Sequence, residues 1–324
     1  MNRFAFPFPV RALRTLAACS AFAVGGAYGA PVVDVTASFS ILGDLVHQVG
    51  GDRVRVSLLI GPDQDAHAFQ PRPSDARKLA DARLIVANGL GFDDWVTRLA
   101  HSAGASARVL IASAGASTLE MDAASAHDHG HDHGHGHTDE DHKADAHLAI
   151  DPHAWQDVAN VRRYVANIAD ALIAADPQGA DGYRSNAAAY DLRLKALDEE
   201  IRTAFAALPA ASRQVVSSHD AFAYFGRAYG LRFLAPVGVS NNAEPSAAGV
   251  ARLIRQLRAE NVRAVFVENV NDPRLIERIR SESGARVGGT LYSDALSTAA
   301  GPAPDYLSMM RHNFETIRAA LSAD

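Results

Sequence analysis

The chain contains almost no cysteine, and this absence limits the chemistry open to it. Its single cysteine, Cys19, lies within the first thirty of 324 residues. Disulfide bonds and thiolate metal sites are therefore excluded from the rest of the chain. Any metal ion that the protein holds must be bound by nitrogen and oxygen ligands.

The sequence also lacks an excess of basic charge and long apolar runs. It has 31 Lys and Arg residues against 37 Asp and Glu residues, a formal net charge of −6. This acidic balance argues against nucleic acid as a partner. Beyond the N-terminal segment, no apolar run approaches the length that spans a bilayer, so we expect a soluble, monomeric protein outside the cytoplasm.

The first 29 residues have the pattern of a secretory signal peptide. Three arginines precede a short apolar run at 16–24, and small residues follow at the positions that signal peptidase reads. We expect cleavage after Gly29 and a periplasmic mature protein. The run LAAC at 16–19 also resembles a lipoprotein cleavage box, but only four residues separate Arg14 from Cys19. A lipid anchor at Cys19 is therefore the less favoured route.

Short β-branched runs alternate with helical stretches along the mature chain, which predicts an α/β fold with mainly parallel sheets. Strands are expected at 32–38, 54–60, 83–89 and 107–113, and again at 213–218, 232–238, 263–269 and 285–292. Between these two groups lies a helical stretch with few breakers, which at about 25 residues would extend roughly 38 Å. We interpret that stretch as a connector between two lobes.

The predicted organisation follows from this alternation. It consists of a signal peptide at 1–29, an N-terminal α/β lobe at 30–180, a connecting helix at 181–208 and a C-terminal α/β lobe at 209–324. A long helix should resist bending more than a loop would, so we expect small, local movement between the lobes when a ligand leaves.

A histidine-rich segment at 122–147 interrupts the first lobe. It lacks hydrophobic periodicity, so we predict an unstructured loop. A flexible loop can chelate metal, but forming a fixed tetrahedral site would cost it much conformational entropy. We therefore expect an accessory role in capture, transfer or sensing of weakly held ions, the alternative being a hydrophilic linker with incidental affinity. The accessory candidates are His127, His129, His131, His133, His135, His137, His142 and His147.

Three other histidines share a setting that favours a common binding site. His67 follows a predicted strand, His153 precedes a predicted helix, and His219 lies where a strand gives way to a helix. Ligands of open α/β sheets bind beyond the carboxyl ends of strands, where such loops converge. Each histidine alone would be read as a loop residue bonded to backbone, but their joint placement favours a metal site. The remaining histidines fall in or beside predicted helices and are interpreted as surface or packed residues: His47, His101 and His312.

Asp294 is a fourth candidate, because it also follows a predicted strand. Its carboxylate either caps a following helix or completes the ligand set. The sequence leaves these two roles open.

Five segments together resemble the periplasmic substrate-binding proteins of zinc or manganese ABC transporters, over nearly the whole mature chain. They are GPDQDAHAFQPRPSD at 61–75, DPHAWQDVANV at 151–161, SSHDAFAYFGRAYGL at 217–231, VFVENVNDPRLIERIRSESG at 265–284 and LYSDALS at 291–297. The resemblance implies two α/β lobes joined by a rigid helix, one tightly held metal ion in the cleft between them, and no enzymatic activity.

The resemblance also implies a ligand set. The first two ligands of the family fall on His67 and His153. The third position is histidine in zinc-type members and glutamate in manganese-type members, and here it is His219. The fourth falls on Asp294, which some zinc-type members replace with water. A histidine-rich insertion at this place is common in zinc-type members.

These observations predict a protein that binds Zn²⁺ and delivers it to the membrane permease of an ABC transporter, with a periplasmic metallochaperone as a possible further partner. Imidazole-rich sites suit Zn²⁺, whereas Mn²⁺ favours oxygen ligands. Because imidazole must be neutral to bind, we expect affinity to fall below about pH 6.5.

Three other functions stay open at this point. One is a manganese-type binding protein, and another is a zinc-buffering adhesin that meets no transporter. The third is a zinc hydrolase with Asp65 or Glu268 as the base, although the sequence has no HExxH helix and Asp294 would fill the position that activates water.

Overall fold

The structure of the protein is a computed structural model. The structure describes Met1 and residues 32–121, 149–209, 212–239, 246–260, 262 and 264–322. The predicted cleavage site, Cys19 and the accessory histidines lie outside the described residues. From Val32 onward the chain forms one compact unit. Among the described helices, none is both long enough and apolar enough to cross a membrane.

The first sheet has four parallel strands in the order β2-β1-β3-β4. They are β1 (Val33–Phe39), β2 (Val54–Ile60), β3 (Leu84–Ala87) and β4 (Arg108–Ile111). All four residues of β3 are buried, as are all but one in β1. This continuous burial explains why both read as unbroken apolar runs instead of alternating ones.

The second sheet repeats the arrangement, with parallel strands in the order β6-β5-β7-β8. They are β5 (Gln214–Val216), β6 (Arg232–Leu234), β7 (Ala264–Glu268) and β8 (Arg286–Leu291). The predicted α/β class with mainly parallel sheets is confirmed. Strand β6 is shorter than the predicted run 232–238, because Pro236 has no amide hydrogen to continue a ladder.

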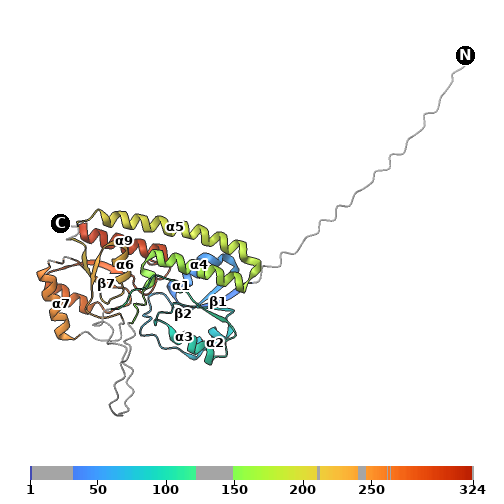
Figure 1. Cartoon of the computed structure of the whole chain (residues 1–324), viewed down its shortest axis with the longest axis horizontal. Coiled ribbons are helices and arrows are strands. Elements are labelled where there is room, and N and C mark those ends of the chain that lie inside the picture. Colours follow the sequence, from blue (N-terminus) through green and yellow to red (C-terminus); the bar gives the residue numbers. More distant parts are fainter. Residues whose placement is uncertain are drawn as a thin grey trace, which may run out of the picture. The chain divides into compact units, whose positions relative to one another are not determined.

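Helices cover these sheets (Figure 1). They are α1 (Ser40–Gly50), α2 (Pro73–Asp81), α3 (Asp94–Ser102), α4 (Val158–Ala175), α6 (Ala223–Tyr229), α7 (Ala247–Ala259), α8 (Arg274–Ser283) and α9 (Tyr306–Ser322). The Asp157 carboxylate accepts a hydrogen bond from the Ala159 amide and caps α4. Helix α6 begins four residues after His219, whose backbone amide donates to Glu268.

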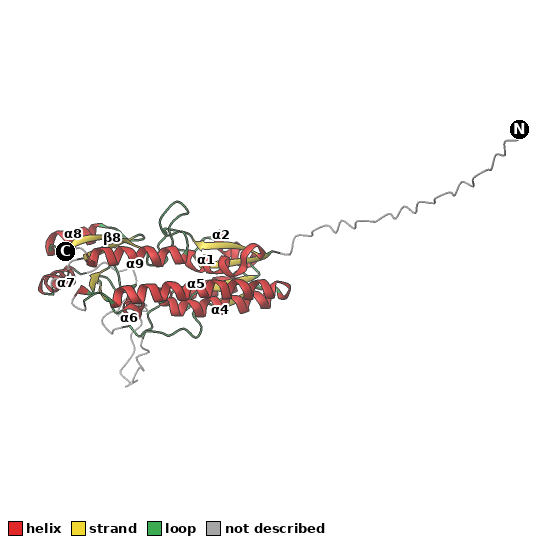
Figure 2. Ribbon diagram, turned by 90° about the horizontal axis from the view of Figure 1, so that it is seen from above, coloured by secondary structure: helices red, strands yellow, loops and turns green. Residues whose placement is uncertain are grey.

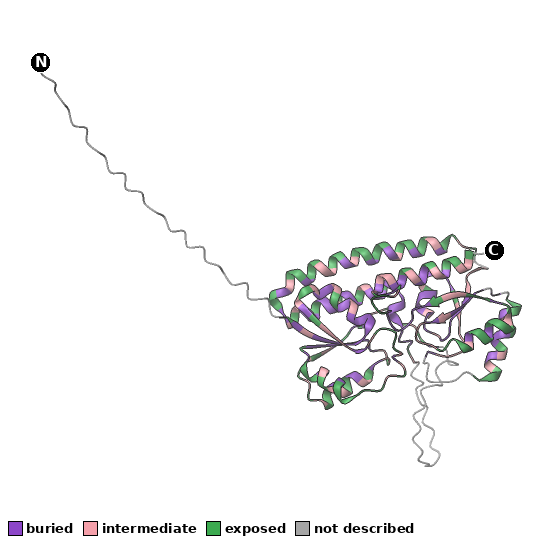
Figure 3. Ribbon diagram, turned by 180° about the vertical axis from the view of Figure 1, so that it is seen from behind, coloured by how far each residue is buried: buried purple, intermediate pink, exposed green. Residues whose placement is uncertain are grey.

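Helix α5 (Ala180–Ala206) is the longest of the described helices and runs past both lobes (Figures 1 and 2). It packs against α1 and α4 in the first lobe and against α6 and α9 at its other end. Its outward face is largely exposed (Figure 3). Its buried residues recur at helical spacing: Tyr183, Tyr190, Leu194, Leu197, Ile201 and Phe205.

The chain returns to the first lobe after the second sheet. Helix α9 packs against β8 and α5, and its first residue, Tyr306, reaches back to the first lobe. The Tyr306 amide donates to Asp44 and its hydroxyl donates to the Trp155 carbonyl, both within 2.9 Å. The segment between β8 and α9 is thereby held against both lobes. The exact lobe boundaries proposed from the sequence stay predictions.

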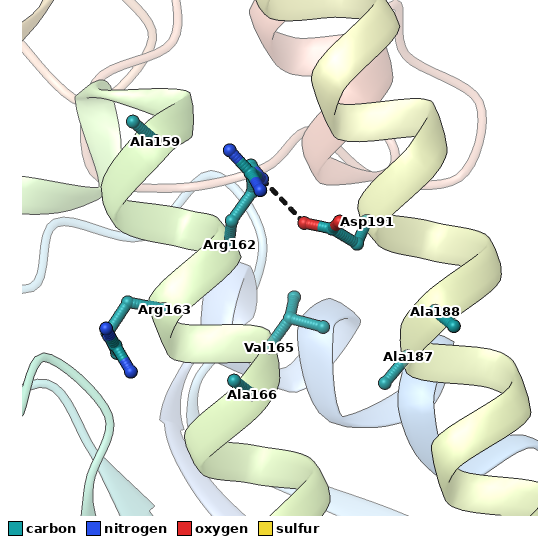
Figure 4. Close-up of a pocket in the computed structure, with 8 residues that line it drawn as sticks. All are labelled: Ala159, Arg162, Arg163, Val165, Ala166, Ala187, Ala188 and Asp191. Carbon is teal, nitrogen blue, oxygen red and sulfur yellow. Dashed lines mark hydrogen bonds and ion pairs between the residues drawn. The ribbon is translucent and has the colours of Figure 1, made fainter.

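A shallow groove of about 490 Å³ lies between α4 and α5, and four of its eight lining residues are alanines (Figure 4). Small side chains let the two helices approach closely. Arg162 and Asp191 point toward each other across it and form an ion pair with a nitrogen-to-oxygen distance of 2.6 Å. None of the four predicted metal ligands lines this groove.

Two glycines offer a matched test of packing. A Cβ on Gly226 in α6 would lie 2.7 Å from the Leu231 carbonyl oxygen, whereas the space around Gly182 in α5 is open among the described residues. We expect Gly226→Ala to lower the free energy of unfolding by about 1–3 kcal/mol. Gly182→Ala should raise it by up to about 1 kcal/mol. Urea denaturation of the metal-free protein measures both, and equal effects would contradict the packing described.

Candidate metal centre

The structure brings together the four side chains that the sequence singled out. One donor atom from each of His67, His153, His219 and Asp294 lies within 4.8 Å of the others. His67, His219 and Asp294 follow β2, β5 and β8 respectively. His153 does not directly follow a regular strand; it comes after an isolated bridge between Ile150 and Glu120. The centre lies where segments of both lobes meet.

The carboxylate of Asp294 is surrounded by the three imidazoles. Its oxygens lie 3.4 Å from His67 Nε2, 3.5 Å from His153 Nε2 and 3.2 Å from His219 Nε2. The ring centroids are 5.4–5.7 Å apart in all three pairs, so the rings form a nearly regular triangle. Such convergence of four donor groups is a geometry that can hold one metal ion.

Burial makes this cluster costly without a bound ion. The side chains of His153, His219 and Asp294 are fully buried, and that of His67 is 9% exposed. Within the described part of the chain, the Asp294 oxygens and the Nε2 atoms of His153 and His219 have no partner in hydrogen-bonding orientation. Buried polar atoms in this state are unusual in native proteins and point to an absent ligand.

The segments that carry His67 and His153 share one local hydrogen-bonding arrangement. Asp65 and Asp151 each stand two residues before a histidine, and each accepts a hydrogen bond from that histidine's backbone amide. The repeated Asp-x-His spacing was the available sequence signal for these carboxylates. Asp151 was not predicted from the sequence, and Asp65 was predicted only as a candidate hydrolase base.

Carboxylates also contact two of the imidazole rings at Nδ1, the nitrogen that does not face Asp294. Asp151 Oδ1 lies 2.8 Å from His153 Nδ1, and Glu268 Oε2 lies 2.6 Å from His219 Nδ1. Glu268 accepts two further hydrogen bonds, from the amides of Ser218 and His219. Metal-binding histidines characteristically have such a carboxylate on the second nitrogen, which fixes the ring and its tautomer. Glu268 therefore orients His219 and does not face the centre as a hydrolase base would.

Aromatic rings close one side of the centre. Phe92 packs edge-on against His67 with ring centroids 5.1 Å apart, and Trp155 packs against His153 at 5.2 Å. Phe92 and Trp155 also contact each other, at 4.8 Å. These rings keep water from that side and lower the local dielectric constant, which strengthens every charge interaction inside.

The charges of the centre shift two pKa values in opposite directions. Burial by itself lowers the pKa of His219, but the carboxylates of Glu268 and Asp294 outweigh it and raise that pKa well above the usual 6.5. Burial raises the pKa of Asp294, but the imidazoles of His219 and His153 outweigh it and lower that pKa well below 3.8. The opposite shifts have one origin, because the positive form of His219 and the negative forms of the two carboxylates stabilise each other.

The remaining described histidines lie away from the centre, as expected. His47 and His101 are exposed on α1 and α3. His312 on α9 is bonded through Nε2 to the Thr290 carbonyl.

A family model described as the periplasmic component A of a zinc-uptake complex, ZnuA, matches residues 35–320. The chain is 29% identical over 323 residues to the manganese-binding lipoprotein MntA of Halalkalibacterium halodurans, which covers 99% of this chain and all of that protein. It is also 29% identical to the manganese transporter lipoprotein PsaA of Streptococcus pneumoniae, over 89% of this chain and 88% of that protein.

Solved structures agree with this likeness. The periplasmic zinc-binding protein TroA of Treponema pallidum superposes with a TM-score of 0.79 at 26% identity, over 90% of this chain and all of that one. A manganese-bound periplasmic metal-binding protein of Candidatus Liberibacter asiaticus, the S38A mutant, gives 0.76 at 27% identity, over 89% of this chain and 99% of that one.

The raised pKa of His219 predicts that metal binding releases a proton. An ion can bind only neutral imidazole, so at pH 7.5 it must displace the proton that Glu268 and Asp294 stabilise. We expect zinc affinity to increase with pH beyond 6.5, with release of up to about one proton. Calorimetry in two buffers of different ionisation enthalpy counts the protons. Glu268→Gln should reduce the number of protons released. Equal numbers in wild type and in Glu268→Gln would show that the proton does not depend on Glu268.

The raised pKa of His219 also affects the stability of the metal-free protein, which should change with pH in the opposite direction to zinc affinity. A histidine with a raised folded pKa stabilises the fold fully below about pH 6.5, and this contribution is lost as pH rises through the folded value. The stability difference between metal-free wild type and His219→Gln should therefore shrink from pH 6.5 to pH 9, as measured by thermal unfolding.

Proposed function

Since the chain belongs to the ZnuA family of periplasmic zinc-uptake components, whose model matches it over residues 35–320, we propose that it is the substrate-binding protein of a zinc ABC transporter. The observation that carries the proposal is the buried cluster of three imidazoles and one carboxylate. Binding proteins of this kind hold their cargo and release it unchanged. The family therefore excludes the zinc hydrolase considered from the sequence.

We propose His67, His153, His219 and Asp294 as the ligands of one tightly held Zn²⁺. Zinc bonds to nitrogen and oxygen of about 2.0–2.2 Å in a tetrahedron would place neighbouring ligand atoms about 3.3–3.6 Å apart. Asp294 Oδ2 lies 3.4 Å from His67 Nε2 and 3.2 Å from His219 Nε2, close to these values, while Oδ1 lies 3.5 Å from His153 Nε2. Three imidazole nitrogen ligands also match the preference of Zn²⁺ better than that of Mn²⁺, which favours oxygen ligands.

Manganese is the second candidate, and two observations favour it. Relatives of similar length, MntA and PsaA, carry manganese in their names. In addition, both oxygens of Asp294 face imidazoles, Oδ1 toward His153 and Oδ2 toward His67 and His219. A carboxylate that binds through both oxygens would raise the coordination number toward what Mn²⁺ accepts. We favour zinc, because the third ligand is the imidazole of His219 and Asp294 is the one residue of the four that offers oxygen ligands.

The proposed partner is the membrane permease of the transporter, and a periplasmic metallochaperone is a further proposed donor of zinc. We propose a periplasmic location for the protein. The names of MntA and PsaA describe lipoproteins, which supports an anchor at Cys19 over the cut after Gly29 that the sequence analysis preferred. Mass spectrometry of the mature protein distinguishes the two routes, because an anchored chain begins at a lipid-modified Cys19 and a cleaved chain begins at residue 30.

The histidine-rich segment keeps its proposed accessory role. Its eight histidines lie at 127–147, between the described residues Met121 and Ala149. The Met121 amide donates to the Ala149 carbonyl, so the two ends of the segment are joined at its base. Asp151 lies two residues after Ala149, and its carboxylate contacts the His153 ring. The histidine-rich segment is therefore close in sequence to one proposed ligand.

Zinc titration separates the proposed site from the accessory segment. His67→Ala, His153→Ala and His219→Ala should each abolish tight binding, because each removes one ligand and leaves a buried carboxylate less compensated. Deletion of residues 127–142 should lower the stoichiometry but leave one tight ion. Calorimetry on the mature protein measures both quantities, with manganese titrated in parallel. If the deletion removes the tight event and His219→Ala does not, the two roles are reversed.

Loss of the gene tests the transport role. We expect a deletion strain to grow poorly in chelated medium and to recover when zinc is added, because a lost uptake component is bypassed at high external metal. Wild-type protein should complement the strain, whereas His153→Ala should not. Recovery with manganese but not zinc would favour the second candidate, and normal growth without either metal would support a buffering adhesin.

A further inference from the structure

Asp63 adopts a backbone conformation that L-amino acids avoid. Its φ is +53°, and of the described residues other than glycine only Leu90 shares a positive φ. The left-handed region costs an L-residue about 1–2 kcal/mol, less for Asp than for most. Strain of this kind persists where surrounding contacts impose it, and it marks positions with a functional constraint. Asp63 lies four residues before His67, in the same loop.

The contacts of Asp63 explain why the strain is tolerated. Its amide donates to the Leu296 carbonyl at 2.9 Å, and its carboxylate accepts from the Thr298 amide at 3.2 Å. Its other carboxylate oxygen accepts from the Asn269 side chain at 3.0 Å. Leu296 and Thr298 follow Asp294 in the chain. Asn269 follows Glu268, the residue that orients His219.

The Asp294 segment is held from the inside as well. The side chains of Trp155 and Gln156 both donate to the Ser293 carbonyl, at 2.8 and 2.7 Å. The Leu296 amide donates to the Ser40 hydroxyl at 3.0 Å. These inner donors and acceptors are buried, so separating them would leave polar groups without water or partners. The two side-chain contacts of Asp63, with Asn269 and Thr298, are solvent-exposed and can be exchanged for water more easily.

We propose that Asp63 is a positioning residue that clasps the His67 loop to the Asp294 and Glu268 segments and thereby slows release of the bound ion. It touches neither the ion nor a ligand, and it acts through the segments that carry them. The inference rests on the proposed metal site but not on which metal occupies it.

The clasp is the part of the site that can open first. For an ion to leave, His67 Nε2 and Asp294 Oδ2, 3.4 Å apart, must separate. His67 is also the only one of the four residues whose side chain is partly exposed. The inner contacts of Ser293 and Leu296 keep Asp294 in place, so the movement falls on the His67 loop. Besides His67 itself, Asp63 of that loop contacts the segment directly, through Leu296 and Thr298.

Dissociation kinetics test the clasp. Zinc-loaded protein is mixed with excess chelator in a stopped-flow instrument, and Asp63→Ala should release zinc about five- to ten-fold faster than wild type. Asp63→Asn should show a smaller increase, because its amide oxygen can accept one of the two hydrogen bonds. Asp81→Asn, an exposed acid at the end of α2, removes the same charge and should release zinc at the wild-type rate.

Asp63→Gly distinguishes positioning from a structural role. Glycine relieves the positive φ, so the metal-free protein should keep or raise its thermal midpoint while zinc release still accelerates. Faster release together with a lowered midpoint would indicate general destabilisation and overturn the proposal. Wild-type release rates in Asp63→Ala and Asp63→Gly would overturn it as well.

A second measurement separates the clasp from the choice of metal. In the metal-free protein, hydrogen exchange at the Thr298 amide should be faster in Asp63→Gly than in wild type, because that amide loses its acceptor. If wild type holds manganese and not zinc, the proposed function fails, and the release experiment is run with manganese. Unchanged Thr298 exchange in Asp63→Gly would overturn the clasp whichever metal is held.

Discussion

The buried carboxylate of Asp294 is the group on which the organisation of the site depends. A charge without water or a counter-ion is very costly inside a protein, so three imidazoles must converge on it. Either a proton on His219, whose pKa Glu268 and Asp294 raise, or a bound metal ion can supply the balancing charge. The carboxylates of Asp151 and Glu268 fix the rings that make this exchange possible. Metal and proton therefore compete for the same electrostatic role.

The fold places these groups by combining two similar sheets with one continuous support. Each sheet ends in loops that carry ligands, and α5 packs along both lobes so that the loops meet (Figure 1). The aromatic rings of Phe92 and Trp155 then shield one side of the cluster. Affinity arises from preorganisation of this kind, because little remains to be ordered when an ion enters.

Much of this could be predicted from the sequence, since it depends on local signals. Apolar runs marked the strands, the stretch with few breakers marked α5, and strand-end turns marked His67 and His219. What could not be predicted depends on contacts between distant segments. The pairing of Glu268 with His219 joins two strands, and the contacts of Asp63 join residues more than two hundred positions apart. Periodicity carries no information on such pairs.

The return of the chain to the first lobe determines when the site can exist. Asp294 is near the C-terminus, and its segment is fixed by Ser40 and Trp155 from the first lobe and followed by α9. A chain that crosses a membrane unfolded, N-terminus first, cannot assemble this cluster until almost all of it has emerged. The four side chains can therefore hold an ion together only after nearly the whole chain has folded, however early the first sheet forms.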